Sequence, residues 1–400
     1  MHSVSLYKNN QATENKRNVF LAFSVLIFVL SPIYSLQDTA NPGALYVLSI
    51  IISTFFYCSI HHKIRLYSYH YIAILMWCFG IISNLLGPFG VFDFGIFKYL
   101  SFVIYFICIS SIRFTSKDLK FIAKYYIYTA IIISILIILS YIFGYAYSDA
   151  YSSMGRYSID ITGIDKNPNY LTSFVNIALY VIWYSVWGKG NQRIKCIVVI
   201  CIFVPSIYFT GTRAALILAI FVITIVFLNH IKYNGKIFLT LLVLFVAFLS
   251  VLFLKDYFVD MMDYYLGQRN MLEDVGRTDS WLIAYQKILE YPMFGCGLFA
   301  WDTIGKSAPL DYLHNVFLEL ILNQGVIGLI LFACMFLGGI TKIKKEDKFF
   351  IYIFIIVTAF PLLFQNGVIA VNFWRFIILN RIVINYSIYS KDGIATLCHK

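Results

Sequence analysis

The sequence predicts an all-α fold, a polytopic membrane helical bundle of about twelve transmembrane helices. Hydrophobic residues make up 60% of the 400 positions and charged residues only 13%, with a mean hydropathy of +0.78. Soluble domains average roughly 45–50% apolar and about 25% charged residues. Apolar stretches near the roughly 20 residues that a helix needs to cross a bilayer recur along the chain, with short lysine-bearing links between them. Segments of this length indicate helices rather than a barrel.

The expected spans follow one another closely from the N-terminal part of the chain to the C-terminal part. They occupy residues 19–35, 43–60, 70–88, 96–113, 122–146, 168–187, 194–210, 213–230, 237–254, 314–341, 349–366 and 373–389.

Basic residues predict the orientation of these spans, because links on the cytoplasmic side are enriched in Lys and Arg. With the N-terminus inside, the inner links contain 20 of the 31 Lys and Arg residues, and the first outer link, QDTANPG, contains none. The net charge of +11 is therefore mainly a topology signal. We expect no nucleic-acid partner. The inner basic residues are Lys8, Lys16, Arg17, Lys63, Arg65, Arg113, Lys117, Lys120, Lys124, Lys189, Arg193, Lys195, Lys232, Lys236, Lys342, Lys344, Lys345, Lys348, Lys391 and Lys400.

A long outer loop, 255–313, divides the chain into 1–254 with helices 1–9, the loop itself, and 314–400 with helices 10–12 and a cytoplasmic tail. A long connection in a compact protein is usually functional or disordered, and the tryptophans of this one favour order. Within it, RTDSWLIAYQKILEYP predicts an amphipathic helix, capped by Thr278 or Asp279 and stopped by Pro292. Its apolar stripe would lie on the membrane surface, under a lid or against the bundle. The stripe contains Trp281, Leu282, Tyr285, Ile288 and Leu289.

His314 precedes the tenth span and is the only one of the seven histidines expected on the outer side. Asn315 follows it directly. Imidazole is the side chain best suited to proton transfer near neutral pH. The alternative is a histidine that reaches the interface for solvation alone.

Arginines gather on the expected outer side, where few positive charges are expected. Arg213 follows a short turn in FTGTRAALIL, and an arginine at membrane depth costs roughly 2.5–3.5 kcal/mol on insertion scales, so it usually faces a cavity or a partner. Guanidinium groups bind phosphate in a planar, bidentate way. Together, these arginines indicate binding of a phosphate or diphosphate head group, although each arginine alone is more often a surface charge. The others are Arg156, Arg269, Arg277 and Arg375.

The stretch KNPNYLT leads into the sixth span. Asn167, Pro168 and Asn169 favour a turn and a helix start, and their amides are alternatively ligands for sugar hydroxyls. The chain shows no Walker loop, no Asp-x-Asp pair near the membrane, no Cys-x-x-Cys and no metal-ligand spacing. We therefore expect no cofactor and no metal.

Three of these stretches together, TGTRAALIL, GRTDSW…ILEYPMFGCGLF and LHNVFLELILNQGVIG, resemble the O-antigen polymerase and ligase superfamily. The resemblance covers roughly residues 200–340, and the N-terminal half is similar only in hydropathy and loosely at KNPNYLT.

The resemblance implies a membrane glycosyltransferase that uses a lipid-pyrophosphate donor, with its active site facing the periplasm at the bacterial inner membrane. Arg213 and Arg277 would bind the diphosphate of undecaprenyl pyrophosphate, and His314 would activate the acceptor or orient the donor phosphate. We add Arg156, Arg269 and Arg375 as substrate contacts because they are positively charged and expected on the outer side. Asn315 is added because it lies beside His314. The expected partners are the lipid-linked glycan, membrane lipid and a chain-length regulator protein.

Three functions fit the sequence. A polymerase, which we favour, joins lipid-linked repeat units, whereas a ligase transfers the glycan to lipid A-core. A flippase for lipid-linked polysaccharide is the alternative from another class. Essential residues confined to the outer face would favour an enzyme, and essential charges at mid-membrane would favour transport.

Overall fold

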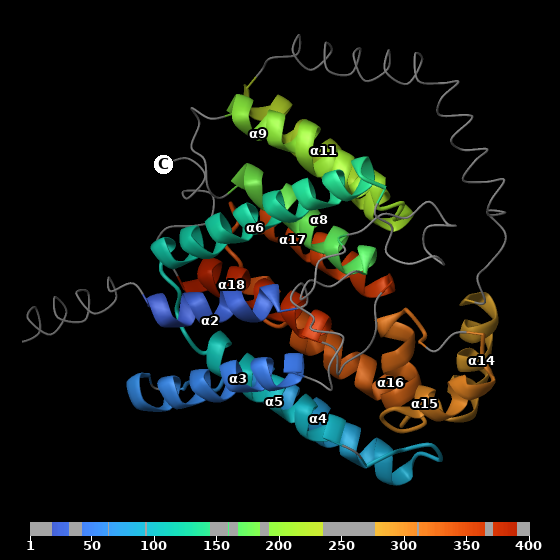
Figure 1. Cartoon of the computed structure of the whole chain (residues 1–400). Coiled ribbons are helices and arrows are strands. Elements are labelled where there is room, and N and C mark those ends of the chain that lie inside the picture. The colour runs from blue at the N-terminus through green and yellow to red at the C-terminus, as the bar shows by residue number, and fades with distance from the viewer. Residues whose placement is uncertain are drawn as a thin grey trace, which may run out of the picture.

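The computed structural model describes residues 18–31, 42–62, 64–92, 94–144, 159, 167–184, 192–234, 277–309, 312–364 and 371–389. All regular structure in these ranges is helical, which confirms the all-α prediction (Figure 1). The α-helices are α2 (Val19–Leu30), α3 (Pro42–His61), α4 (Ser68–Leu86), α5 (Phe94–Ser110), α6 (Ser116–Ile142), α8 (Pro168–Tyr184), α9 (Gln192–Val198), α10 (Val204–Phe209), α11 (Arg213–Asn234), α14 (Arg277–Glu290), α15 (Ala300–Ile304), α16 (Val316–Leu337), α17 (Lys348–Ala359) and α18 (Val371–Tyr389). A π-helix, η2 (Val199–Phe203), joins α9 to α10, and 3₁₀ turns occupy η3 (Gly305–Ser307), η4 (Ile340–Lys342) and η5 (Phe360–Phe364).

Helices occupy every predicted span except 237–254, which lies outside the described residues. By length and composition, three helices of the described part are able to cross a membrane: Ser68–Leu86, Ser116–Ile142 and Val316–Lys342. Six further apolar helices are shorter, among them Val19–Leu30 and Lys348–Phe364.

Helix α18 lies in the interior of the bundle, and its side chains from Phe373 to Ile378 are almost completely buried. Trp374 packs against Tyr99, Phe102 and Phe106 of α5 through ring contacts with centroids 6.0–6.2 Å apart. Large aromatic rings of this kind supply much of a core's buried apolar area.

Polar side chains of α18 join it to its neighbours. Arg381 donates to the carbonyls of Met335 and Gly338 near the end of α16, each at 2.5 Å, and lies over the Tyr69 ring at 4.1 Å. Asn385 donates to the carbonyl of Ser110 at the end of α5, at 2.7 Å. Each polar group is costly inside a membrane unless it is bonded, so these contacts favour one arrangement of helices.

Helix α16 packs along α4 and is interrupted at Gly325, whose φ of 63° and ψ of −169° are not helical. A loop after α14 fills the interruption: the amides of Cys296 and Gly297 donate to the carbonyls of Leu322 and Asn323 at 2.7 and 3.2 Å. A Cβ at Gly325 would lie 2.2 Å from the Met293 oxygen, so only glycine fits there. The GCG stretch therefore packs against the middle of α16.

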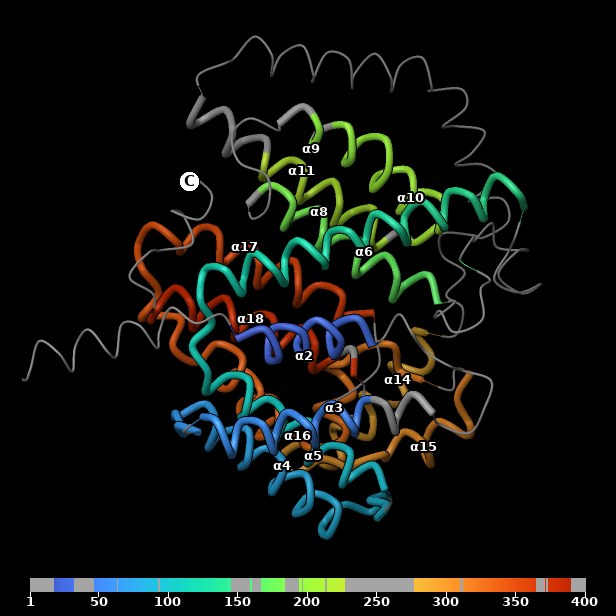
Figure 2. The backbone as a smooth tube through the Cα atoms, turned by 60° about the vertical axis from the view of Figure 1, so that its left-hand side comes forward, coloured from blue at the N-terminus to red at the C-terminus, as the bar shows by residue number. Residues whose placement is uncertain are grey.

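The predicted amphipathic helix is confirmed as α14 (Arg277–Glu290), which ends two residues before Pro292. The expected cap residues Thr278 and Asp279 lie inside its first turn, where an acidic side chain suits the positive end of the helix dipole. Helices α14 and α15 both contact α16 and lie at one end of the bundle (Figures 1 and 2). We call this the α14 end; α8, α11, α16 and α18 begin there.

Candidate functional site

His314 lies at the start of α16 in a left-handed conformation, with φ of 50°. Such a conformation costs a non-glycine residue roughly 1–2 kcal/mol, so its neighbours must hold it. On one side, Leu313 is 1% exposed and its carbonyl accepts a hydrogen bond of 2.8 Å from Trp281 Nε1. On the other side, Asn315 begins α16. The half-buried His314 ring is therefore held between two fixed residues, with the Tyr312 ring centroid 6.2 Å away.

Asn315 caps α16. Its Oδ1 accepts from the amides of Phe317 and Leu318, each at 3.1 Å. This use of an N-cap side chain satisfies helix-end donors that otherwise lack a partner. If Asn315 contacts substrate, it therefore does so through its Nδ2.

Helix α14 places Arg277 near the same surface. Arg277 lies one helical turn before Trp281, and residues four apart share a face of a helix. Since Trp281 bonds to Leu313, this face of α14 is turned toward the chain around His314. The structure thus places the turns that hold Arg277 and His314 at the same end of the bundle.

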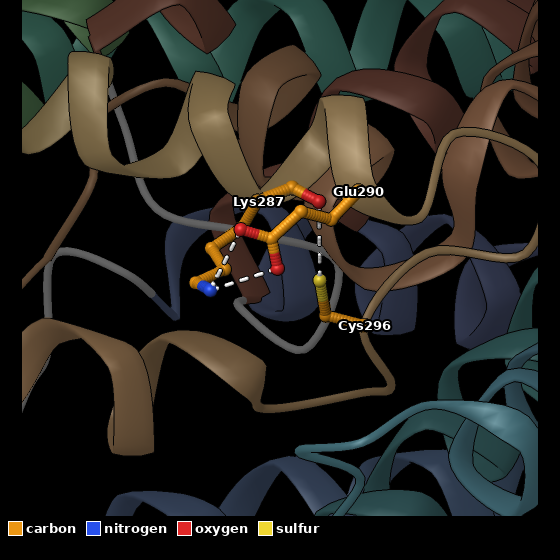
Figure 3. Close-up of polar contacts among 3 residues, drawn as sticks. All are labelled: Lys287, Glu290 and Cys296. Carbon is orange, nitrogen blue, oxygen red and sulfur yellow. Dashed lines mark hydrogen bonds and ion pairs between the residues drawn. The ribbon is translucent and has the colours of Figure 1, made fainter.

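The far end of α14 is attached to the loop that follows it (Figure 3). The Cys296 thiol contacts the Lys287 carbonyl at 3.8 Å, and Lys287 Nζ lies 2.8 Å from Glu290 Oε2. Burial raises the pKa of Cys296 to about 11, an effect that Lys287 opposes and Glu290 reinforces. Cys296 is thus a protonated packing group at neutral pH.

A second group of polar residues lies where α8, α11 and η5 meet. They line a small, open pocket with room for about one water molecule, whose polar side chains are Asn169, Thr172, Ser173, Asn176 and Thr212. The predicted residue Arg213 begins α11 directly after Thr212, beyond a turn in which Gly211 has φ of 64°. The positive ends of the α8 and α11 dipoles both face this region.

Arg375 is completely buried one turn into α18, and its Nη2 donates to Ser173 Oγ. The sequence predicted an arginine at the outer end of the last span, and the structure adds that this guanidinium reaches the pocket-lining Ser173. Arg156 and Arg269 lie outside the described residues.

Sequence reasoning did not single out Trp281 as a positioning residue or Thr172, Ser173, Asn176 and Thr212 as pocket residues. The α8 residues recur at positions i, i+3, i+4 and i+7 from Asn169, a polar face on an otherwise apolar span. That pattern was the signal that could have found them.

The model of a family described as O-Antigen ligase matches residues 196–333. No curated protein matches the chain. The matched segment contains Arg213, Arg277 and His314, whereas Arg156 and Arg375 lie outside it. The match covers about a third of the chain and supports, over residues 196–333, the resemblance to the O-antigen polymerase and ligase superfamily.

Proposed function

We propose that this protein is an O-antigen polymerase, which joins undecaprenyl-pyrophosphate-linked oligosaccharide repeat units at the outer face of the bacterial inner membrane. The observation that carries the proposal is the restrained, left-handed His314, bonded through its neighbour Leu313 to the helix that begins with Arg277. Strained backbone of this kind is concentrated at functional sites.

The proposed reaction is one displacement at the anomeric carbon of the donor sugar. An acceptor hydroxyl attacks that carbon, and His314 takes the hydroxyl proton as general base. The bond between the anomeric carbon and the diphosphate oxygen breaks, and undecaprenyl pyrophosphate leaves with the electron pair. The configuration inverts, and His314 passes its proton to solvent or to the departing diphosphate.

Arginines stabilise the leaving group in this proposal. Charge develops on the diphosphate as the glycosidic bond breaks, and fixed guanidiniums stabilise it without reorganisation. Arg213 and Arg277 hold the diphosphate. Arg156, Arg269 and Arg375 add positive charge along the path of the substrate, and the Asn315 amide nitrogen contacts the glycan.

The proposed topology has about twelve spans with the α14 end in the periplasm. The surface of α14 supports a position at the membrane. One face packs into the protein through Trp281 and Ala284, whereas Leu282, Tyr285 and Leu289 are 53%, 52% and 61% exposed. An unpacked apolar strip beside a membrane bundle fits a helix that lies in the interface.

A ligase that transfers the glycan to lipid A-core is the second candidate, favoured by the description of the matched family. Both reactions use the same donor and the same leaving group, so the acceptor distinguishes them.

The test is the surface polysaccharide of a deletion strain, displayed as a gel ladder and complemented with His314→Ala or Arg277→Ala. His61→Ala and Arg113→Ala are matched controls, because both side chains are exposed and belong to the opposite end of the bundle.

Lipid A-core capped by one repeat unit in the deletion strain identifies a polymerase. Bare core with long polymer accumulating on undecaprenyl pyrophosphate identifies a ligase. The two site variants should reproduce the deletion phenotype, and both controls should restore the ladder. A normal ladder with both site variants would refute the catalytic roles of His314 and Arg277.

A further inference from the structure

Helix α6 (Ser116–Ile142) has one exposed stripe along its length. The exposed residues recur at positions i, i+3, i+7 and i+11 and again at i+18 and i+22, and this spacing places them on one face of a helix. Helices α2, α8 and α10 contact α6 and leave this face uncovered. We call it the α6 stripe; its residues are Lys117, Lys120, Lys124, Tyr128, Ile135 and Leu139.

The chemistry of the α6 stripe changes along the helix in the order in which a phospholipid changes along its length. Its first two turns present three exposed ammonium groups, Tyr128 follows, and the rest is aliphatic. Tyrosine is enriched at the membrane interface, between the head groups and the hydrocarbon. Lys124 Nζ lies 5.5 Å from the centroid of the Tyr128 ring, so the charged part and the interfacial part adjoin.

The dimensions of the α6 stripe fit one leaflet. At 1.5 Å per residue, Lys117 and Lys124 lie about 10 Å apart along the helix axis, and Tyr128 and Leu139 about 16 Å apart. The hydrocarbon of one leaflet is about 15 Å deep, half of the bilayer core. Tyr128, Ile135 and Leu139 are 39%, 41% and 40% exposed, so acyl chains of that depth would lie against apolar side chains throughout.

The lysines of the α6 stripe have no carboxylate partner. Asp118 lies in the same turn but is completely buried, and it accepts from the Asn18 amide at 3.1 Å and from the Thr115 amide and hydroxyl at 2.9 and 2.6 Å. No carboxylate among the described residues forms an ion pair with these lysines. The stripe therefore presents three positive charges that an external anion can neutralise.

Helix α6 begins at the end of the bundle opposite the α14 end. Arg113, which shortly precedes α6, lies over the Tyr389 ring at 4.9 Å from its centroid. Tyr389 ends α18, which begins at the α14 end. In the orientation that the basic residues predict, the lysines therefore lie at the cytoplasmic leaflet, on the other side of the membrane from His314.

We propose that the α6 stripe binds an anionic phospholipid of the cytoplasmic leaflet, whose phosphate contacts the three lysines and whose acyl chains lie along the apolar part. The inference depends on the position of α6 in the membrane and not on the proposed reaction. It makes the lipid composition of the cytoplasmic leaflet a determinant of what surrounds α6.

The test is crosslinking of the full-length protein in nanodiscs that contain equal amounts of phosphatidylglycerol and phosphatidylcholine with the same acyl chains. Benzoylphenylalanine in place of Tyr128 keeps an aromatic ring on the stripe and crosslinks to adjacent lipid under light. Mass spectrometry of the crosslinked peptide gives the ratio of the two lipids at this position.

Two triple variants carry the same crosslinker. One replaces the stripe lysines, as Lys117→Gln, Lys120→Gln and Lys124→Gln. The matched control removes three positive charges at the same end of the bundle but off the stripe, as Lys342→Gln, Lys345→Gln and Lys348→Gln. The link before α17 also has an exposed carboxylate, Glu346, among its lysines, which the α6 stripe does not.

The protein with the native lysines should crosslink phosphatidylglycerol at least fivefold more than phosphatidylcholine, since one lysine near an anionic head group contributes about 1 kcal/mol, a factor of about five. The stripe variant should bring the ratio close to one, and the control should keep the native ratio. Lys120→Gln alone should give an intermediate ratio, and it tests the inference if the stripe variant does not fold.

A ratio near one with the native lysines would overturn the inference and show that ordinary bilayer lipid covers α6. An unchanged ratio in the stripe variant would also overturn it, because the lysines would then face the cytosol alone. Equal losses in the stripe variant and the control would overturn it as well, by assigning the preference to the total charge of this end of the bundle.

Discussion

His314 is the residue on which the account depends most directly. Its φ of 50° suits glycine better than any other residue. His314→Gly should therefore keep or slightly raise the apparent melting temperature, because it removes a strain of roughly 1 kcal/mol, while polysaccharide synthesis is lost. Thermal unfolding of the purified protein and the gel ladder measure the two effects. A large drop in melting temperature would give His314 a structural role instead.

Trp281 holds Leu313, the neighbour of His314, through the hydrogen bond from its Nε1. Trp281→Phe keeps the ring in the cluster formed with Ala284 and Ile288 but removes the bond from Nε1 to the Leu313 carbonyl. The loss of one hydrogen bond, about 1 kcal/mol, should reduce kcat about fivefold with KM nearly unchanged. Trp301→Phe is the control, since Trp301 lies in the same cluster and its Nε1 has no hydrogen-bond partner. Equal kcat in both variants would contradict the positioning role.

The alkylation rate of Cys296 should depend on pH in a way that follows from the burial of its thiol. A pKa raised from 9.0 to about 11 leaves about 0.1% thiolate at pH 8, compared with about 10% for an unshifted thiol. Alkylation of Cys296, followed by mass spectrometry, should be slower by a factor of about a hundred or more at pH 8 in the folded protein than in detergent-denatured protein, because the buried sulfur is also shielded from the reagent. Its rate should keep rising to pH 11. A rate that levels off near pH 9 would show that the thiol is not buried.

Helix α14 has two clearly different faces: one packs into the protein, and the other is an exposed apolar strip. A spin label at Tyr285, on the exposed apolar strip, should be accessible to dissolved oxygen and protected from a water-soluble relaxing agent. A label at Glu290, which is exposed and lies farther round the helix from the strip, is the control and should show the opposite pattern. Aqueous accessibility at both positions would place α14 away from the bilayer.

The interruption of α16 depends on one glycine. At Gly325, φ is +63° and an added Cβ would meet the Met293 oxygen at 2.2 Å. Gly325→Ala should lower the apparent melting temperature strongly or prevent accumulation. Gly144→Ala is the control, because its φ is +73° but nothing lies within 4 Å, so only the backbone strain remains. Equal shifts in the two variants would show that the loop at 293–297 does not fix the interruption.

The spacing of apolar residues predicted where the helices lie better than it predicted the interruptions inside them. The apolar repeats placed the described spans, and the stripe from Trp281 to Leu289 placed α14. The interruption at Gly325 was not predicted, because a single glycine in an apolar run is common in membrane helices. Its cause is a distant loop, which no local pattern contains.

In the whole molecule, arginines have roles that the sequence could not separate. Arg375 and Arg381 belong to the same helix and are equally buried, yet Arg381 caps α16 and Arg375 reaches the α8 pocket. The type of residue indicates only that each needs partners. Which helix supplies them depends on packing among α8, α16 and α18, so the sequence predicted the residues of the candidate site better than their neighbours.

The arrangement of helices also explains why segments far apart in the sequence act together. The first turns of α8, α11, α16 and α18 lie at the α14 end (Figure 2). A bundle of antiparallel helices gathers alternate links at one end, so the first turns of α8 and α11, which line the pocket, lie at the same end of the bundle as His314.

We propose that transfer of a lipid-linked glycan occurs at the α14 end with His314 as the base. The most direct measurement is chain growth by the purified protein in nanodiscs supplied with the lipid-linked repeat unit, followed on a gel. The wild-type protein and His61→Ala should lengthen the glycan and release undecaprenyl pyrophosphate with each bond, and His314→Gly should be slower by about a hundredfold or more while still binding the substrate. Chain growth by His314→Gly at the wild-type rate would contradict the account.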